Sequence, residues 1–380
     1  MLEKFEVENF RGFEKPLSFS LVAGRYDFNP QVESQGLVKN AIVYGPNGIG
    51  KSTLGVALFD IILHLTDKNR MGADGMIPFL NMNHLDRPAR FRYEFRFGPD
   101  RVVYEYTKTG PDDLRRERLF RNGERLIDFD YFRPEKRFRF VSKSLIGDLN
   151  IDLVDNKLSV VKYIYRNLPT NSAPVVTDLV QFCESMLWYR SLSDGNRYAG
   201  FTNGINLLDE ILYTSGKREE FRRFLAENGI PYDLEFRSVE GRHVLHVKFK
   251  GGAVPFDLVA STGTRALYLF FVWSISAFPK VSFLFIDEFD AFLHYESAAA
   301  IVRTLNRSKT FQTVLTTHNT SLMNNALTRP DCCYVMSYED GAAGGPGTPI
   351  RIKSLAEATP REVRQVHNLE KMYRNGVFHG

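Results

Sequence analysis

Hydrophobic residues follow two different periods in the first part of the chain. Residues 3–10 and 17–22 alternate between apolar and polar positions, which predicts two short β-strands. Residues 41–44 form a compact β-rich run that ends at a glycine, as a buried strand does. Residues 51–66 then carry apolar side chains on most sides of a predicted helix. The order is therefore strand, glycine-rich turn and helix.

Period-2 alternation returns where charged residues alternate with aromatic ones. In residues 90–97 the charged side chains point to one face and the aromatic side chains point to the other. Residues 137–140 repeat this pattern over a shorter length. Both segments are predicted to be half-buried antiparallel strands with a charged outer face.

The rest of the chain is predicted to contain helices followed by a second α/β section. Residues 145–230 look mainly helical, with loops near 169–174 and 191–204. Residues 266–279 are an apolar run that predicts a buried helix too short to span a bilayer. The other predicted elements are strands at 243–250, 283–286, 313–316 and 333–337, a loop at 341–349 and a terminal helix at 362–375.

Composition narrows the possible classes of protein. The 380 residues are 43% hydrophobic and 25% charged, an ordinary globular composition with a net charge of +4. Residues 87–143 hold 16 Lys/Arg and 10 Asp/Glu, an excess that fits a solvated strand face or a surface for a nucleic-acid backbone. The first is the commoner meaning of a charge run. Three cysteines and a charged N-terminus predict a cytoplasmic protein without membrane insertion.

A phosphate-binding motif occupies the predicted turn after residues 41–44. The sequence GPNGIGKST matches G-x-x-x-x-G-K-[ST], in which backbone N–H groups and a helix N-terminus surround phosphate oxygens. Lys51 is expected to reach the β- and γ-phosphates of ATP, and the Ser52 hydroxyl is expected to bind Mg²⁺. The alternative is a chance match, which is disfavoured because the predicted strand before the motif and the predicted helix after it are the context that the motif needs. The predicted nucleotide-binding residues here are Gly45, Pro46, Asn47, Gly48, Ile49, Gly50, Lys51, Ser52 and Thr53.

A second half of the site is predicted at the end of the apolar run 281–286. A buried parallel strand has this composition, and ligands bind at the carboxyl ends of such strands. Asp287 is expected to hold Mg²⁺, and Glu288 is expected to act as general base on the attacking water. The alternative is an exposed acidic turn, which the presence of a P-loop makes the weaker interpretation.

Two further segments carry candidate site residues. His318 follows another apolar strand, from where an imidazole can contact a γ-phosphate and orient water; the simpler alternative is a lone loop histidine. Ser261 and Gly263, in the segment ASTGTR, precede the predicted buried helix. On residue chemistry alone, a helix cap is the better interpretation of these two residues, and an anion site is the alternative.

The order of these motifs resembles that of the ABC-type ATPases of the SMC, RecF and OLD-like group. The resemblance covers most of the chain and rests on NFRGFEKPLSFSLVAG, NAIVYGPNGIGKST, ASTGTRAL, FIDEFDAFLH, TTHNTSLM and NLEKMYRNGVFHG. It implies an α/β fold, namely a P-loop ATPase head with a mixed sheet, antiparallel N-terminal strands and a mainly helical insert. Residues 1–110 and 256–380 would be the two lobes of the head, and residues 111–255 would be the insert.

The resemblance also implies how such a head works. Two copies close face to face around two ATP molecules, as a homodimer or within a higher assembly. Ser261 and Gly263 of one copy then contact the γ-phosphate held by the other, which makes them predicted site residues. Asp290 is expected near the seam of the dimer, and Arg11 is expected to approach the nucleotide from the N-terminal strands.

The nearest sub-group is that of the short RloA/AbiLi-type ATPases of phage-defence operons. It implies a regulatory ATPase that controls a separate effector, a nuclease or toxin of TOPRIM or another type, because the residues after His318 are too few for such a domain. A transporter subunit is disfavoured, since STGT differs from LSGGQ and no glutamine loop is evident. Residues 81–84 occupy that region, and the sequence leaves their role open. The alternative function is a RecF-like DNA-repair ATPase that binds DNA through Arg90, Arg92 and Arg96.

Overall fold

The chain is built around a central sheet whose strands are largely buried. The computed structural model describes residues 1–68, 77–133, 135, 139–147, 149–152, 154–190, 198–199, 208–308, 311–339 and 348–378. Within these ranges the strands of the central sheet are β5 (Asn40–Tyr44), β11 (Met186–Arg190), β12 (Tyr198–Ala199), β16 (Phe283–Asp287), β17 (Gln312–Thr317), β18 (Cys333–Tyr338) and β19 (Ile350–Ser354). Their order is β12-β11-β16-β17-β5-β18-β19, and the five inner strands are parallel.

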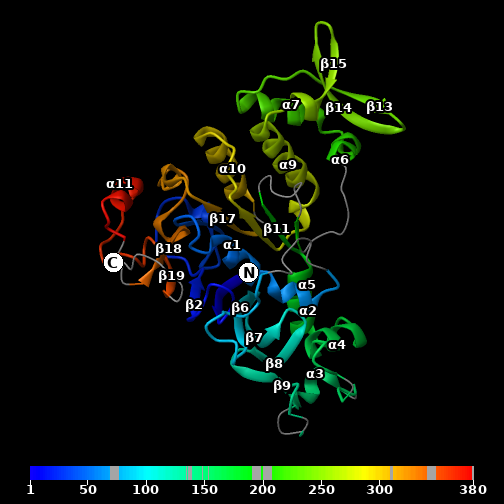
Figure 1. Ribbon diagram of the computed structural model, residues 1–380, viewed down its shortest axis with the longest axis vertical. Helices are drawn as coiled ribbons and strands as arrows, with labels where there is room; N and C mark the ends of the chain where they lie inside the picture. Colours follow the sequence, from blue (N-terminus) through cyan, green and yellow to red (C-terminus); the bar gives the residue numbers. More distant parts are fainter. Residues whose placement is uncertain are drawn as a thin grey trace.

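A second sheet is antiparallel throughout and lies beside the first. Its described strands are β1 (Leu2–Glu8), β2 (Leu17–Ser20), β6 (Ala89–Phe97), β7 (Asp100–Gly110), β8 (Asp113–Arg121), β9 (Glu124–Asp130) and β10 (Arg139–Val141), in the order β10-β9-β8-β7-β6-β1-β2. Smaller sheets consist of β3 (Glu33–Ser34) with β4 (Leu37–Val38), and of β13 (Leu234–Val239), β14 (Arg242–Phe249) and β15 (Gly252–Pro255). In Figure 1 the sheet of β13, β14 and β15 lies at one end of the long axis, and β9 lies near the other.

Some helices pack against the antiparallel sheet, and others pack against the central sheet. They are α1 (Lys51–Leu58), α2 (Asp60–Leu65), α3 (Lys143–Ile146), α4 (Val160–Asn167), α5 (Pro174–Glu184), α6 (Leu208–Ser215), α7 (Arg218–Glu227), α8 (Phe256–Val259), α9 (Thr262–Ser276), α10 (Tyr295–Arg307) and α11 (Leu369–Arg374). One hydrophobic cluster joins α1 and α2 to the antiparallel sheet, and a second joins α9 and α10 to the central sheet. No helix of the described residues is long and apolar enough to cross a membrane.

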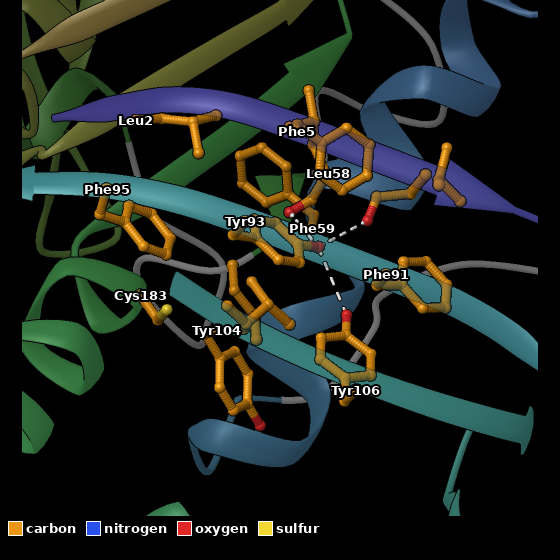
Figure 2. Packing of buried hydrophobic residues seen from close by; sticks show 14 of the residues in the cluster. Leu2, Phe5, Leu58, Phe59, Phe91, Tyr93, Phe95, Tyr104, Tyr106 and Cys183 are labelled. Atoms are coloured by element: carbon orange, nitrogen blue, oxygen red, sulfur yellow. Dashed lines mark hydrogen bonds between the residues drawn. The ribbon is translucent and has the colours of Figure 1, made fainter. Parts of the chain in front are cut away.

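Aromatic side chains hold α1 against the antiparallel sheet. The Tyr93 hydroxyl donates to the carbonyl oxygens of Ala57 (3.0 Å) and Leu58 (3.3 Å) at the end of α1, and it lies 3.3 Å from the Tyr106 hydroxyl (Figure 2). In an unbroken helix these carbonyls would accept bonds from residues 61 and 62. The single helix predicted over 51–66 is therefore wrong, because the chain divides into α1 and α2 at Phe59.

The predicted α/β class with antiparallel N-terminal strands is confirmed, but two segments differ from expectation. The mainly helical segment 145–230 also contains β11, which pairs in parallel with β16 in the central sheet. The terminal helix is shorter than 362–375, because the Asn325 side chain donates to the carbonyls of residues 364, 365 and 367 and Asn368 caps α11. The loops predicted at 191–204 and 341–349, and residues 137–138 of a predicted strand, lie wholly or mostly outside the described residues.

Charged residues on the outer face of the antiparallel sheet form a ladder across five strands. Glu6, Arg92, Glu105, Arg118 and Asp128 lie directly opposite one another on β1, β6, β7, β8 and β9. Each neighbouring pair is an ion pair, with N–O distances of 3.5 Å for the Glu6–Arg92, Glu105–Arg118 and Arg118–Asp128 contacts. Opposite charges in facing positions stabilise a sheet, so this alternation has a structural role.

The other arginines proposed for DNA binding are also ion-paired. Arg90 Nη2 lies 3.7 Å from Glu105 Oε1, and Arg96 Nη2 lies 2.7 Å from Glu3 Oε2. Each of the three arginines named for DNA binding therefore has a carboxylate partner on the strand face. These ion pairs fit the interpretation of the basic segment as a solvated strand face. The DNA-repair function stays an alternative hypothesis.

Candidate functional site

The P-loop is a tight turn between β5 and α1. Gly48 (φ 77°) and Gly50 (φ 106°) adopt left-handed backbone conformations that favour glycine, and Gly50 is the N-cap of α1. Lys51 Nζ donates to the carbonyl oxygens of Gly45 (2.9 Å) and Pro46 (3.0 Å). The predicted loop therefore closes around Lys51, the residue that is expected to contact phosphate.

The remaining P-loop residues differ in their exposure to solvent. Ile49 is 1% exposed and packs in the core, while Pro46, Asn47 and Gly48 are exposed. Ser52 and Thr53 lie in the first turn of α1 and are half-buried. The backbone N–H groups at the start of a helix lack partners within that helix, so this arrangement can accept an anion.

The acidic pair and the histidine lie at the same edge of the sheet as the P-loop. β16, β17 and β5 are adjacent and parallel, so Asp287, His318 and the P-loop follow neighbouring carboxyl ends. His318 is exposed, with Nδ1 at 3.3 Å from Lys51 Nζ. Burial lowers the pKa of the Lys51 ammonium, and the negative charges of Asp287 and Glu288 act in the opposite direction. The structure thus brings these four residues together.

The turn after β16 is held against the end of β17. Glu288 has a φ of 49°, a left-handed conformation that is uncommon for residues other than glycine. Asp290 is 9% exposed, and burial raises the pKa of its carboxyl while hydrogen bonds from Thr317 and Asn319 oppose that rise. The three carboxylates of this turn therefore have distinct surroundings: Asp287 is buried, Glu288 is partly exposed and Asp290 faces β17.

Ser261 and Gly263 lie at the start of α9, away from the contacts of Lys51. Ser261 is the N-cap, and its Oγ accepts a hydrogen bond from Thr264 N at 3.1 Å. A Cβ atom on Gly263 would lie 2.6 Å from the carbonyl oxygen of Phe292, so this position packs the helix against the turn after Asp290. Within the described residues, the hydrogen bonds of Lys51 go to the P-loop and His318.

Arg11 lies in the turn between β1 and β2. Its backbone N donates to Phe79 O (3.1 Å), and its carbonyl accepts from the Asn81 side chain (2.7 Å). Residues 81–84, whose role the sequence left open, thus support this turn. Phe13, in the same turn, packs against the P-loop: its Cε1 atom lies 3.2 Å from the position that a Cβ atom on Gly50 would occupy. Arg11 is two residues before Phe13 in the chain.

The donor atoms near the P-loop fit a hard cation. A serine hydroxyl at position 52 and the carboxylate of Asp287 are oxygen ligands of the kind that Mg²⁺ prefers. No group of three or more His, Cys, Asp or Glu residues in the described ranges could hold a metal by itself. Mg²⁺ in ATPases usually completes its shell with water and phosphate oxygens, so these two donors fit such a site.

Sequence reasoning missed two residues that set this geometry. Thr316 contacts the acidic turn, and Gly55 brings α1 close to β16. A Cβ atom on Gly55 would lie 2.6 Å from Cε1 of Phe285, two residues before Asp287. A glycine on a helix that also carries a P-loop is the only sequence signal for this close approach.

Changing Gly55 to alanine is expected to destabilise the protein by about 1–3 kcal/mol, because the new methyl overlaps the buried Phe285 ring. In an exposed helix the same change would stabilise the fold, since alanine is the better helix former. Urea unfolding followed by circular dichroism measures the difference. Gly251→Ala is the control, as nothing lies within 4 Å of that position. Equal stability of the two variants would contradict the proposed close packing.

One known family matches the segment of the chain that holds most of these site residues. A family model described as "AAA domain, putative AbiEii toxin, Type IV TA system" matches residues 41–324, a range that contains the P-loop, the acidic pair and His318. No curated protein matches the chain.

Several solved SMC heads resemble the chain over most of its length. One is an SmcHead bound to the C-winged helix domain of ScpA, with 16% identity, 94% of this chain and 98% of that chain covered, and a TM-score of 0.45. Another is the SMC head domain from Thermotoga maritima, with 16% identity, coverage of 95% and 99%, and a TM-score of 0.41. A third is the Smc head with an extended coiled coil bound to the C-terminal domain of ScpA from Pyrococcus furiosus, with 14% identity, coverage of 94% and 97%, and a TM-score of 0.44.

Proposed function

The chain belongs to the family described as "AAA domain, putative AbiEii toxin, Type IV TA system", and from this membership we propose that it binds and hydrolyses ATP to regulate a separate effector in anti-phage defence. The observation that carries the proposal is the position of Lys51, Asp287, Glu288 and His318 at adjoining strand ends. Each of these side chains has a chemical role in ATP hydrolysis.

The proposed roles follow from charge and position. Lys51 and the N–H groups at the start of α1 neutralise phosphate charge. Ser52 and Asp287 would hold Mg²⁺, which supplies further stabilisation of negative charge on the phosphates when bound. Glu288 accepts a proton from the attacking water, and His318 contacts the γ-phosphate from the end of β17.

We further propose that two copies close on ATP, with Ser261 and Gly263 of one copy facing the nucleotide of the other. Surfaces suited to such closure are exposed here. Phe292, in the turn packed on Gly263, is 48% exposed. Beside Pro46 and His318 lies a hollow of about 450 Å³ with mostly apolar walls. A second copy would cover both, which would remove apolar surface from water.

The effector is proposed as a separate nuclease or toxin that binds one nucleotide state of this chain. The family description names a toxin system, which supports an output that is harmful to the cell. The ATPase would then act as a switch, in which ATP holds one shape and hydrolysis releases it. Such a switch requires different affinities of the effector for the two states.

A pull-down from the native host tests this regulatory role. Tagged Glu288→Gln protein with Mg-ATP is expected to recover one nuclease or toxin-like protein in stoichiometric amount, identified by mass spectrometry. Lys51→Ala is the control and should lose that protein, because it lacks the ammonium that holds the phosphates. Recovery of recombination proteins with DNA, or of no protein at all, would contradict the role in defence. The DNA-repair function would then be the favoured hypothesis.

A further inference from the structure

The end of β17 contacts three consecutive residues of the acidic turn through a single threonine. Thr316 is fully buried, and its Oγ1 donates to Asp287 Oδ1 at 2.6 Å. The same oxygen accepts a hydrogen bond from the backbone N of Glu288 at 2.8 Å. The carbonyl oxygen of Thr316 accepts a further bond from Phe289 N at 3.2 Å.

These bonds act where the backbone is strained. Glu288 has a φ of 49°, and a left-handed conformation costs a residue with a side chain roughly 1–2 kcal/mol. Such a conformation persists only when the surrounding structure holds it. The bond from Glu288 N to the Thr316 hydroxyl is a contact of this kind, and it fixes the point at which the chain leaves β16.

The hydroxyl of Thr316 has one proton, so its contacts with Asp287 and with Glu288 depend on each other. Because the Thr316 proton is donated to Asp287, the lone pairs of the oxygen remain to accept from Glu288 N. A bond from a hydroxyl to a carboxylate is charge-assisted and stronger than a neutral one. The orientation of Asp287 and the backbone position of Glu288 therefore depend on one atom.

We propose that Thr316 is a positioning residue, which sets the orientation of the metal-binding carboxylate of Asp287 relative to the general base Glu288. This inference rests on the proposed function, since those roles are assigned there. Thr316 touches neither the nucleotide nor water in the proposal; it acts through its two neighbours. A purely structural role, by contrast, would lower activity only as far as it lowers the stability of the fold.

The chain offers a matched control on the same strand. Thr313 is also fully buried in β17, and its Oγ1 has no hydrogen-bond partner among the described residues. Thr313→Val removes a hydroxyl of equal burial without removing a contact to the turn. Thr316→Val keeps the shape of the side chain but removes both bonds, and Thr316→Ser keeps the hydroxyl.

The test compares the full-length wild type and these three variants. Thr316→Val is expected to lower kcat about tenfold and to raise severalfold the Mg²⁺ concentration that half-saturates binding of mant-ATP, a fluorescent ATP analogue. Thr316→Ser and Thr313→Val should stay within about threefold of wild type in both quantities. Loss of a contact that supports a metal ligand usually has a larger effect than that. Thermal melting of each variant shows whether it is folded at the assay temperature.

The outcomes separate this inference from the proposed function. If wild type releases no phosphate from ATP, the hydrolytic function fails, while the Mg²⁺ titration of mant-ATP still tests Thr316. If Thr316→Val equals Thr313→Val in both quantities, the positioning role is wrong. If Thr316→Val and Thr316→Ser lose melting temperature and activity alike, the residue is structural and the inference is overturned.

Discussion

Glu288→Gln is expected to lower kcat for ATP hydrolysis by on the order of 100- to 1000-fold while leaving the affinity for Mg-ATP almost unchanged. Glutamine has nearly the same shape but cannot accept the proton of the attacking water, and a general base contributes 10²–10⁴-fold to a rate. Lys51 and the N–H groups at the start of α1 are untouched by this change, so ATP still binds. The variant should accumulate in the ATP-bound form.

Phosphate release measures kcat, mant-ATP fluorescence measures binding, and light scattering with ATP measures the mass in solution. Glu296→Gln is the matched control, because it makes the same change at an exposed carboxylate eight residues further on. Lys51→Ala should lose both binding and hydrolysis. Loss of the general base should lower the rate far more than threefold. If Glu288→Gln keeps more than about a third of the wild-type rate, the general base is therefore another group. If the ATP-bound variant remains a monomer, closure of two copies on ATP is wrong.

Features that are local in the sequence could be predicted from it. The P-loop lies between a buried strand and a helix, as its motif requires, and the apolar run before Asp287 is a buried parallel strand. The family match confirms the predicted group of ATPases. Roles that depend on a second copy, such as those of Ser261 and Gly263, stay predictions, because a single chain displays only the helix cap at that position.

Features that depend on long-range pairing could not be predicted. β11 has five residues, too few to show a period, and its place is set by pairing with β16 almost 100 residues later. The partners of Thr316 lie 28 and 29 positions earlier in the chain. In the sequence, the charged residues around Arg92 form a basic segment. The strand register, which the sequence does not show, places Glu6 and Glu105 directly opposite Arg92. Each of these contacts exists only once the sheets have formed.

Lys108→Met is expected to reduce the free energy of unfolding by about 3–5 kcal/mol, because it leaves the carboxylate of Asp60 buried without its countercharge. Lys108 Nζ lies 2.9 Å from Asp60 Oδ2, and both side chains are fully buried. The Tyr106 hydroxyl also donates to this oxygen, at 3.0 Å, but a neutral donor does not compensate the charge. Since Asp60 opens α2 directly after α1, the loss would reach the helix that carries the P-loop.

Urea denaturation of the single variants and the double variant separates the energy of the pair from that of each side chain. Asp60→Asn with Lys108→Met removes both charges, so the double variant is expected to be more stable than Lys108→Met alone. Lys217→Met is the control, because Lys217 pairs with Glu220 at 3.0 Å on the surface, where such a pair contributes about 0–1 kcal/mol. If Lys108→Met cost no more than Lys217→Met, the buried pair would not stabilise the fold as an ion pair, and the prediction would be wrong.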